Sequence, residues 1–275
     1  MPADYPRRIV CLTEETTETL YLLGAEDRIV GISGFTVRPP RARREKPRVS
    51  AFTSAKIDRI LALQPDLVLG FSDLQADIAA QLVRAGIAVH VFNQRSVAQI
   101  LQMVLQVGGL IGAEQPAQVL HGQLCKGIEA VRVAAGGLRR RPRVYFEEWD
   151  NPQISCIRWV SELIGIAGGD DCFAELARQP LGRDRIIADP DEVVRRQPDI
   201  IFGSWCGKKF SPRTVMAREG WGAIPAVRDA AVFEIKSSII LQPGPAALTD
   251  GLQALHAHIA RWSVPGDEAA ATAPA

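Results

Sequence analysis

The feature that most constrains the fold is an internal repeat of thirteen residues. Residues 58–70 read DRILALQPDLVLG and residues 191–203 read DEVVRRQPDIIFG, at a constant offset of 133 residues and without a gap. Asp, Gln, Pro, Asp and Gly recur in equivalent places, and so do five apolar positions. Each copy predicts a helix that ends at a Gln-Pro step, then a buried strand, then a glycine where the strand meets a loop. We therefore expect two αβ lobes.

The pattern around the repeat predicts an α/β protein with two Rossmann-like lobes. Short β-branched runs predict strands at residues 8–12, 28–32, 66–70, 88–92, 143–146, 199–203 and 231–235. Helical patterns lie at residues 16–23, 56–63, 74–85, 154–167, 191–196 and 248–262. Between residues 96 and 135 no strand is indicated, and apolar residues recur at helical spacing. The expected organisation is an N-terminal lobe, a long helical connector, a C-terminal lobe and a disordered tail, at residues 1–95, 96–140, 141–265 and 266–275.

Composition excludes several classes of protein. Lys and Arg number 32 against 31 acidic residues, which argues against a general nucleic-acid binder. No run approaches the roughly 18 apolar residues of a membrane span, and no signal-peptide pattern follows the first residues, so we expect a cytoplasmic protein as written. A true start further upstream would instead permit a periplasmic one. Five cysteines without CxxC spacing suit reduced thiols, and no metal site is expected.

Aromatic residues follow several predicted strands. In two-lobed αβ proteins, ligands bind where loops converge at the carboxyl ends of the strands. Trp149 and Trp205 stand at such places in the second half of the chain, and Phe35, Phe52 and Phe71 in the first. Rings there suit a large, flat, partly apolar ligand, because they offer contact area at little entropic cost. The same rings would alternatively cover the core beneath the loops.

Polar residues at the same strand ends add hydrogen-bonding groups. Glu147 is a candidate acceptor for ligand amides, and Lys236 a candidate donor to a phosphate. Cys206 is either a soft metal ligand or a small buried apolar residue. No GxGxxG, GxSxG or P-loop spacing occurs, so an enzyme is possible but not indicated.

The repeat and its flanks resemble a known family, from Arg8 to about Trp262. The residues that carry the likeness are the opening strand, the Gln-Pro-Asp run, a Gly-Gly pair, the second-lobe opening strand and a late Gln-Pro-Gly-Pro loop, at residues 8–12, 64–68, 168–169, 143–149 and 241–245. They look like the helical-backbone class (class III) of ABC-transporter substrate-binding proteins, and most like its vitamin-B12-binding branch.

The resemblance implies non-catalytic binding of a corrinoid such as cobalamin in a cleft between the lobes, by a carrier or a sensor. Gln242 joins the candidate ligand-binding residues because it lies in the family-like late loop. Haem or a ferric siderophore is the alternative ligand, and an enzyme that reuses the fold is the alternative class. The family docks on an ABC permease through two acidic residues, one in each lobe. Asp58 and Asp191 match those positions but are shorter than the usual glutamates, and an acid at a helix start is also favourable by itself.

Overall fold

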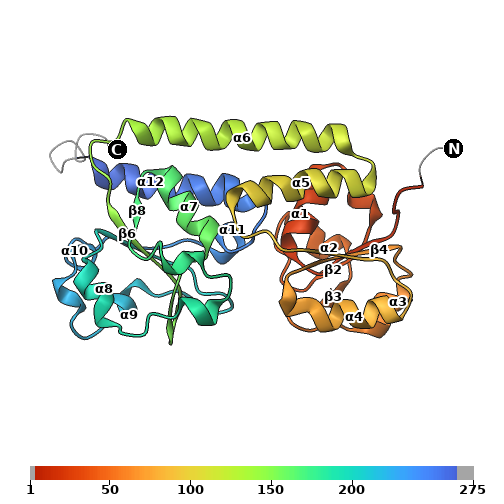
Figure 1. Cartoon of the computed structure of the whole chain (residues 1–275), viewed down its shortest axis with the longest axis horizontal. Coiled ribbons are helices and arrows are strands. Elements are labelled where there is room, and N and C mark those ends of the chain that lie inside the picture. The colour runs from red at the N-terminus through yellow and green to blue at the C-terminus, as the bar shows by residue number, and fades with distance from the viewer. Residues whose placement is uncertain (1–3, 265–275) are drawn as a thin grey trace. The chain divides into compact units, whose positions relative to one another are not determined.

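The computed structural model describes residues 4–264, which form two compact units (Figure 1). The first unit, here called lobe 1, comprises the chain up to Gln94 together with Ala98–Cys125 and Gln242–Pro245. The second, lobe 2, comprises Arg95–Val97, Lys126–Leu241 and the residues from Ala246 onward. The predicted tail at 266–275 lies outside the described residues.

Lobe 1 is built on a parallel sheet of five strands in the order β3-β2-β1-β4-β5. The strands are β1 (Ile9–Cys11), β2 (Ile29–Ser33), β3 (Arg48–Ser50), β4 (Leu67–Phe71) and β5 (Val89–Phe92). Every residue of the two central strands β1 and β4 is buried. Continuous apolar runs of this kind are typical of parallel strands that are covered on both faces.

Short helices cover the lobe 1 sheet. They are α1 (Glu14–Leu22), α2 (Ala42–Glu45), α3 (Ile57–Ala62) and α4 (Ala76–Arg84), with 3₁₀ turns at Glu26–Arg28 and Asp73–Gln75. The core between sheet and helices contains residues of β1, β3 and β4 together with Ile60 of α3 and Ile78 and Leu82 of α4. Burial of these aliphatic side chains, at roughly 25 cal/mol per Å², holds the helices on the sheet.

The strand-free middle of the sequence forms two helices, α5 (Val97–Ile111) and α6 (Glu114–Gly136). The boundary between the two units falls after Cys125, within α6. Gly112 joins the helices with a φ of +66°, and a Cβ there would overlap the ring of Tyr5. A glycine is therefore required at this turn. None of the helices in the described part of the chain has the length and apolarity that a membrane crossing needs.

Lobe 2 contains a mixed sheet in the order β10-β9-β6-β7, and β8 pairs with β6 as well. The strands are β6 (Arg143–Asp150), β7 (Gln153–Ser155), β8 (Asp170–Asp171), β9 (Ile200–Gly203) and β10 (Val232–Glu234). Strands β6, β9 and β10 run parallel, whereas β7 returns antiparallel to β6.

The helices of lobe 2 are α7 (Arg158–Ala167), α8 (Asp191–Arg196), α9 (Pro212–Met216), α10 (Pro225–Arg228), α11 (Ser237–Ile240) and α12 (Leu252–Ser263). Three 3₁₀ turns lie at Leu176–Arg178, Gly182–Arg185 and Trp221–Ala223, and a π-helical segment at Ala247–Gly251 leads into α12. Helix α12 packs along α7, where a ring nitrogen of His256 lies 2.9 Å from the carbonyl oxygen of Ala167.

The structure explains why the repeat contains Gln-Pro-Asp. Gln64 and Gln197 both adopt a left-handed backbone, with φ of 47° and 46°, and so end α3 and α8. The carboxylate of Asp66 then accepts hydrogen bonds from the backbone N–H groups of Arg7 (2.7 Å) and Arg8 (2.9 Å). Asp199 accepts one in the same way from Arg143 (2.8 Å). In each lobe the aspartate thus fastens the start of the strand beside it.

The α/β class with two lobes is confirmed, and several boundaries differ from the prediction. Residues 153–155 form β7 instead of the start of a helix, because they pair with the end of β6 across a turn at Asn151-Pro152. Strand β6 therefore extends to Asp150, and Glu147, Glu148 and Trp149 lie inside it rather than in a following loop. Strand β3 was not predicted, since its three residues include only one buried apolar side chain.

Candidate functional site

The three lobe 1 aromatics have different surroundings. Phe35, after β2, is 54% exposed, and Phe52, after β3, is half-buried. Phe71 is the last residue of β4 and is buried. Buried Gln75 fastens this region, because its side chain accepts from the N–H of Phe71 (2.9 Å) and donates to the carbonyl of Phe52 (2.8 Å). Phe35 and Phe52 thus have exposed ring surface, whereas Phe71 packs inside the lobe.

Lobe 1 also buries carboxyl groups that the sequence reasoning missed. Helix α1 begins directly after β1, and its residues Glu14, Glu15 and Glu18 are all buried. Burial, reinforced by the neighbouring Glu14, raises the pKa of Glu15 to about 8. Thr13 donates a hydrogen bond to Glu15 (2.7 Å), and Glu18 pairs with Arg38 (2.8 Å). The sequence does contain one signal for this cluster. It is the polar run of residues 13–18, which stands where a helix meets the core.

In lobe 2, Glu147 is the centre of a buried network. Its carboxylate has no exposed surface and accepts from Arg218 at 2.5 and 2.9 Å. The hydroxyl of Tyr145 (3.0 Å) and the indole N–H of Trp205 (3.1 Å) complete the set of donors. A buried charge is tolerated when it is paired and hydrogen-bonded in this way. Both oxygens of Glu147 are engaged by the protein, and one of their contacts fixes the orientation of Trp205.

The next residue along β6 makes a second ion pair. Glu148 accepts from both terminal nitrogens of Arg185, at 2.7 and 2.9 Å, and Arg185 is almost fully buried. Successive strand residues point to opposite faces, so Glu147 and Glu148 fasten β6 on its two sides. The arginines that they bind lie 71 and 37 residues away in sequence, and no local pattern indicated either one.

Trp149 and Trp205 share a single cation. The ammonium nitrogen of Lys208 lies 5.0 Å from the ring centroid of Trp205 and 5.7 Å from that of Trp149, which is the range of a cation–π interaction. Asp150 holds the same ammonium at 2.5 Å. Trp205 is only 4% exposed and meets the edge of Phe210, whereas Trp149 is half-buried. The two indoles therefore share one ammonium that is itself paired with Asp150, and only Trp149 has substantial exposed surface.

The remaining predicted residues of lobe 2 lie at the surface. Cys206 is exposed and directly follows Trp205. Lys236 caps the start of α11 and pairs with Glu234 (2.5 Å), with its side chain mostly exposed. No group of three or more His, Cys, Asp or Glu side chains able to hold a metal ion occurs within residues 4–264.

Gln242 is the last of the predicted site residues. It belongs to the segment Gln242–Pro245, which is part of lobe 1. It is half-buried, and its carbonyl accepts from the N–H of Gly244 (2.8 Å). The adjacent Pro243 accepts a hydrogen bond from the side chain of Gln94 (2.9 Å). This segment is therefore fixed to the loop that follows β5.

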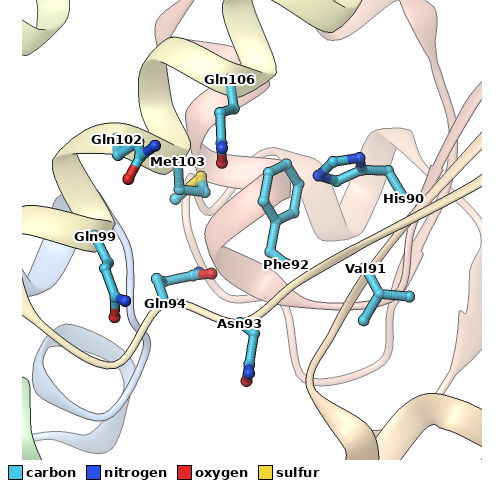
Figure 2. Close-up of a pocket in the computed structure, with 9 residues that line it drawn as sticks. All are labelled: His90, Val91, Phe92, Asn93, Gln94, Gln99, Gln102, Met103 and Gln106. Atoms are coloured by element: carbon cyan, nitrogen blue, oxygen red, sulfur yellow. The ribbon is translucent and has the colours of Figure 1, made fainter.

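That loop borders a groove of about 310 Å³ in lobe 1, shown in Figure 2. One wall is β5 and its continuation through Gln94, and the other is a face of α5. The lining is dominated by side-chain amides. They belong to Asn93, Gln94, Gln99, Gln102 and Gln106.

The described residues thus form two αβ lobes, one with two tryptophans beside a lysine and the other with an amide-lined groove. The chain matches the periplasmic binding protein family over residues 9–239 and belongs to that family. The family consists of non-catalytic substrate-binding proteins of ABC transporters, and the predicted family and the absence of catalysis are thereby confirmed.

Among the most similar relatives is the vitamin B12-binding protein of Vibrio parahaemolyticus, 25% identical over 249 residues, which span 88% of this chain and 85% of the relative. The solved periplasmic vitamin B12 binding protein BtuF of Vibrio cholerae aligns with a TM-score of 0.74 at 21% identity, covering 92% of this chain and 96% of that one. The periplasmic heme-binding protein RhuT of Roseiflexus sp. RS-1 aligns with a TM-score of 0.77 at 24% identity, covering 92% and 99%. At these identities the solved structures establish the fold alone.

Proposed function

We propose that this protein binds a corrinoid of the cobalamin class as the substrate-binding component of an ABC importer. The observation that carries the proposal is the half-buried ring of Trp149 in lobe 2, which shares the ammonium of Lys208 with the buried Trp205. A corrinoid offers a flat, partly apolar ring that the exposed part of Trp149 would contact. Relatives named for vitamin B12 binding cover most of this chain, which supports the same choice.

Each residue then has a distinct role. Trp149 contacts the ligand directly from lobe 2, and Phe35 and Phe52 are the candidate rings of lobe 1 with exposed surface. Glu147 acts through Trp205, since its own oxygens are engaged by Arg218 and Tyr145. The exposed side chains of Cys206 and Lys236, together with Gln242, supply polar contacts at the margin of the ligand.

Haem is the second candidate, because solved proteins with this fold include heme-binding ones with comparable TM-scores. Haem differs from cobalamin in two properties that this site would sense. Its carboxylates carry a double negative charge, whereas cobalamin has one phosphate and many neutral amides. The one ammonium beside the tryptophans is already paired with Asp150, so this site offers little to balance a double negative charge.

Titration of the purified protein with cyanocobalamin, haemin and ferrichrome separates the ligand classes. The proposal predicts saturable binding of cyanocobalamin, seen as a heat signal and as quenching of tryptophan fluorescence, with weaker binding of the other two. Saturable binding of haemin or ferrichrome without any response to cyanocobalamin would refute the corrinoid assignment. Catalytic turnover of a metabolite by the purified protein would show instead that it is an enzyme.

We also propose that the protein works outside the cytoplasm and docks on an ABC permease through Asp58 and Asp191. Both are exposed first-turn residues of short helices, α3 and α8, and occupy equivalent places in the repeat. Neither makes an ion pair with another residue of the described range, so both carboxylates are available to a basic partner. Fractionation of cells that express the native gene tests the location. Recovery of the protein in the cytoplasmic fraction alone would refute this part of the proposal.

A further inference from the structure

Within the described residues the two sheets have five edge strands, and β5 differs from the other four. β8 consists of only two residues, both aspartates. β3 is only three residues long and carries the exposed Arg48, and β10 ends in Glu234. β7 is covered, because Ile154 forms a bridge with Ile186 outside the sheet. Shortness, charge and cover are the usual means by which proteins prevent an edge from pairing with another chain.

Strand β5 is also short, with four residues, but it has no charged residue, and helix α5 leaves a groove along it. Its sequence, Val-His-Val-Phe, is uncharged, has high strand propensity and continues into Asn93 without a proline. It pairs with β4 on one side, and within the described residues no strand pairs with it on the other. Burial lowers the pKa of His90 below its ordinary value, so this ring too is neutral at pH 7. Val91 is 40% exposed at the middle of the edge.

The hydrogen bonds to β4 show which backbone groups face outward. The carbonyl of Ala88 accepts from Val68 (2.9 Å), and that of Phe92 accepts from Ser72 (2.7 Å). In a parallel ladder alternate residues bond to the same neighbour, so the even-numbered residues of β5 face β4. The N–H and C=O groups of Val91 and Asn93 therefore point away from the sheet, as hydrogen-bonding groups for a further strand.

Helix α5 forms the second wall of the groove along this edge. Gln99, Gln102 and Gln106 lie on one helical face, at a spacing of three and four residues, and Figure 2 shows them on the side of the helix that faces the strand. The amides of Gln102 and Gln106 each carry two N–H donors and an acceptor oxygen. Gln94 is 4% exposed, and its Oε1 accepts no hydrogen bond from the described residues, although it lies beside the groove.

We propose that the groove between β5 and α5 binds an extended, uncharged peptide segment of a partner protein, which adds a sixth strand to the lobe 1 sheet. The backbone of the segment pairs with Val91 and Asn93, and the amides of α5 hydrogen-bond to its polar side chains. None of the described residues that line the groove carries a charge, so a charged segment would lose its hydration without compensation. This inference concerns a surface of lobe 1 alone and does not depend on the corrinoid proposal.

The shape of the groove favours a single strand over a second copy of the protein. The occupant must fit between the strand edge and the helix that flanks it. A second copy of the protein would bring its own α5 along with its β5, and both would have to fit beside the first α5. An isolated segment has no such helix.

The probe is an acetylated and amidated hexapeptide of alternating threonine, valine and glutamine, labelled with a fluorophore. Its matched control has the same sequence with alternate N-methyl groups, which cannot donate along one edge. Saturable anisotropy with the first peptide, at least tenfold weaker with the second, is the expected result. Equal binding of the two peptides, or no binding of either, would overturn the proposal.

Variants locate the peptide on the molecule. Val91→Lys places a charge on the edge, and Asn93→Pro removes an outward N–H without breaking a bond to β4. Each should weaken peptide binding about tenfold, whereas Val83→Lys, at a more exposed valine on α4, should leave it unchanged. Unaltered binding by both edge variants would overturn the proposal. So would a concentration-dependent dimer that Val91→Lys abolishes, since it would assign the edge to a second copy.

Discussion

The two lobes share a repeat and a strand-and-helix plan, yet one buried carboxyl in each lobe is held in the opposite way. In lobe 2 the buried carboxylate of Glu147 is paired with Arg218, and Glu148 is paired with the almost fully buried Arg185. In lobe 1 Glu15 is also buried, but burial and the neighbouring carboxylate of Glu14 raise its pKa to about 8. Glu147 is compensated by an arginine, whereas the Glu15 carboxyl tends to be neutral.

This difference shows what the repeat does and does not determine. The Gln-Pro-Asp step gives the same helix end and the same aspartate contact in both lobes. The residues beyond the strands are not repeated, and they give lobe 2 an aromatic surface held by ion pairs and lobe 1 an uncharged, amide-lined groove. Fold therefore follows the repeat, while binding chemistry follows the residues around it.

The largest expected effect is on stability, from Arg218→Met. Removing this guanidinium leaves the fully buried Glu147 without its ionic partner, which costs about 3–5 kcal/mol in such pairs. The urea midpoint of unfolding should fall accordingly. Arg195→Met is the control, because Arg195 pairs with Asp189 at the exposed surface, where solvent screening leaves a salt bridge with little effect on stability. Equal losses in both variants would contradict the compensated network.

The second prediction concerns pH and lobe 1. The folded-state pKa of Glu15, about 8, lies above its ordinary value of 4.5, so the folded protein binds the proton more tightly than the unfolded chain. This contribution to stability is complete below pH 4.5 and is lost as the pH rises to about 8. Glu15→Gln, which mimics the protonated form, should flatten that decline by a few kcal/mol at most. The exposed Glu114→Gln should not, and an unchanged pH profile in Glu15→Gln would show that this carboxyl ionises normally.

A third test compares a half-buried aromatic residue of lobe 2 with a buried one of lobe 1. Trp149→Ala should weaken corrinoid binding by roughly tenfold to a hundredfold, because a ring of this size contributes about 1–3 kcal/mol through area and geometry. Phe71→Leu in lobe 1 should leave affinity unchanged, since Phe71 is buried in its own lobe. Calorimetric titration measures both variants. Wild-type affinity in Trp149→Ala would remove this tryptophan from the site.

Lys208 provides a sharper version of the same test. If its ammonium contacts the phosphate of cobalamin, Lys208→Met should weaken cyanocobalamin binding about threefold to tenfold, the worth of a partly exposed ionic hydrogen bond. Binding of cobinamide, which lacks that phosphate, should not change. Lys209→Met is the matched control at the next residue. Equal losses for both corrinoids would mean that Lys208 acts only by covering the tryptophans.

The smallest effect is expected from Asp58→Asn and Asp191→Asn. Each removes a charge from the first turn of an exposed six-residue helix, which costs about 0.3–1 kcal/mol. Corrinoid affinity should remain that of the wild type, while uptake by cells should fall in the double variant. Full uptake in the double variant would limit both aspartates to a role in helix stability.

Much of the fold was predictable, because long apolar and helical patterns are local signals. The short strands β3 and β7 were not, since each has only three residues and few buried apolar side chains. Trp149 and Trp205 were found from their places after predicted strands, although Trp149 in fact lies within β6. Arg218 and Arg185 could not be found, because only the tertiary fold brings them to Glu147 and Glu148.

The central claim, that the site takes a corrinoid, is tested most directly by competition. The protein is dialysed to equilibrium against cyanocobalamin and haemin at equal concentrations, and the bound ligands are identified from their absorption spectra. We expect cyanocobalamin to occupy the protein at one molecule per chain, and Trp149→Ala to reduce this occupancy. Haemin in its place, or neither ligand on a folded protein, would contradict it.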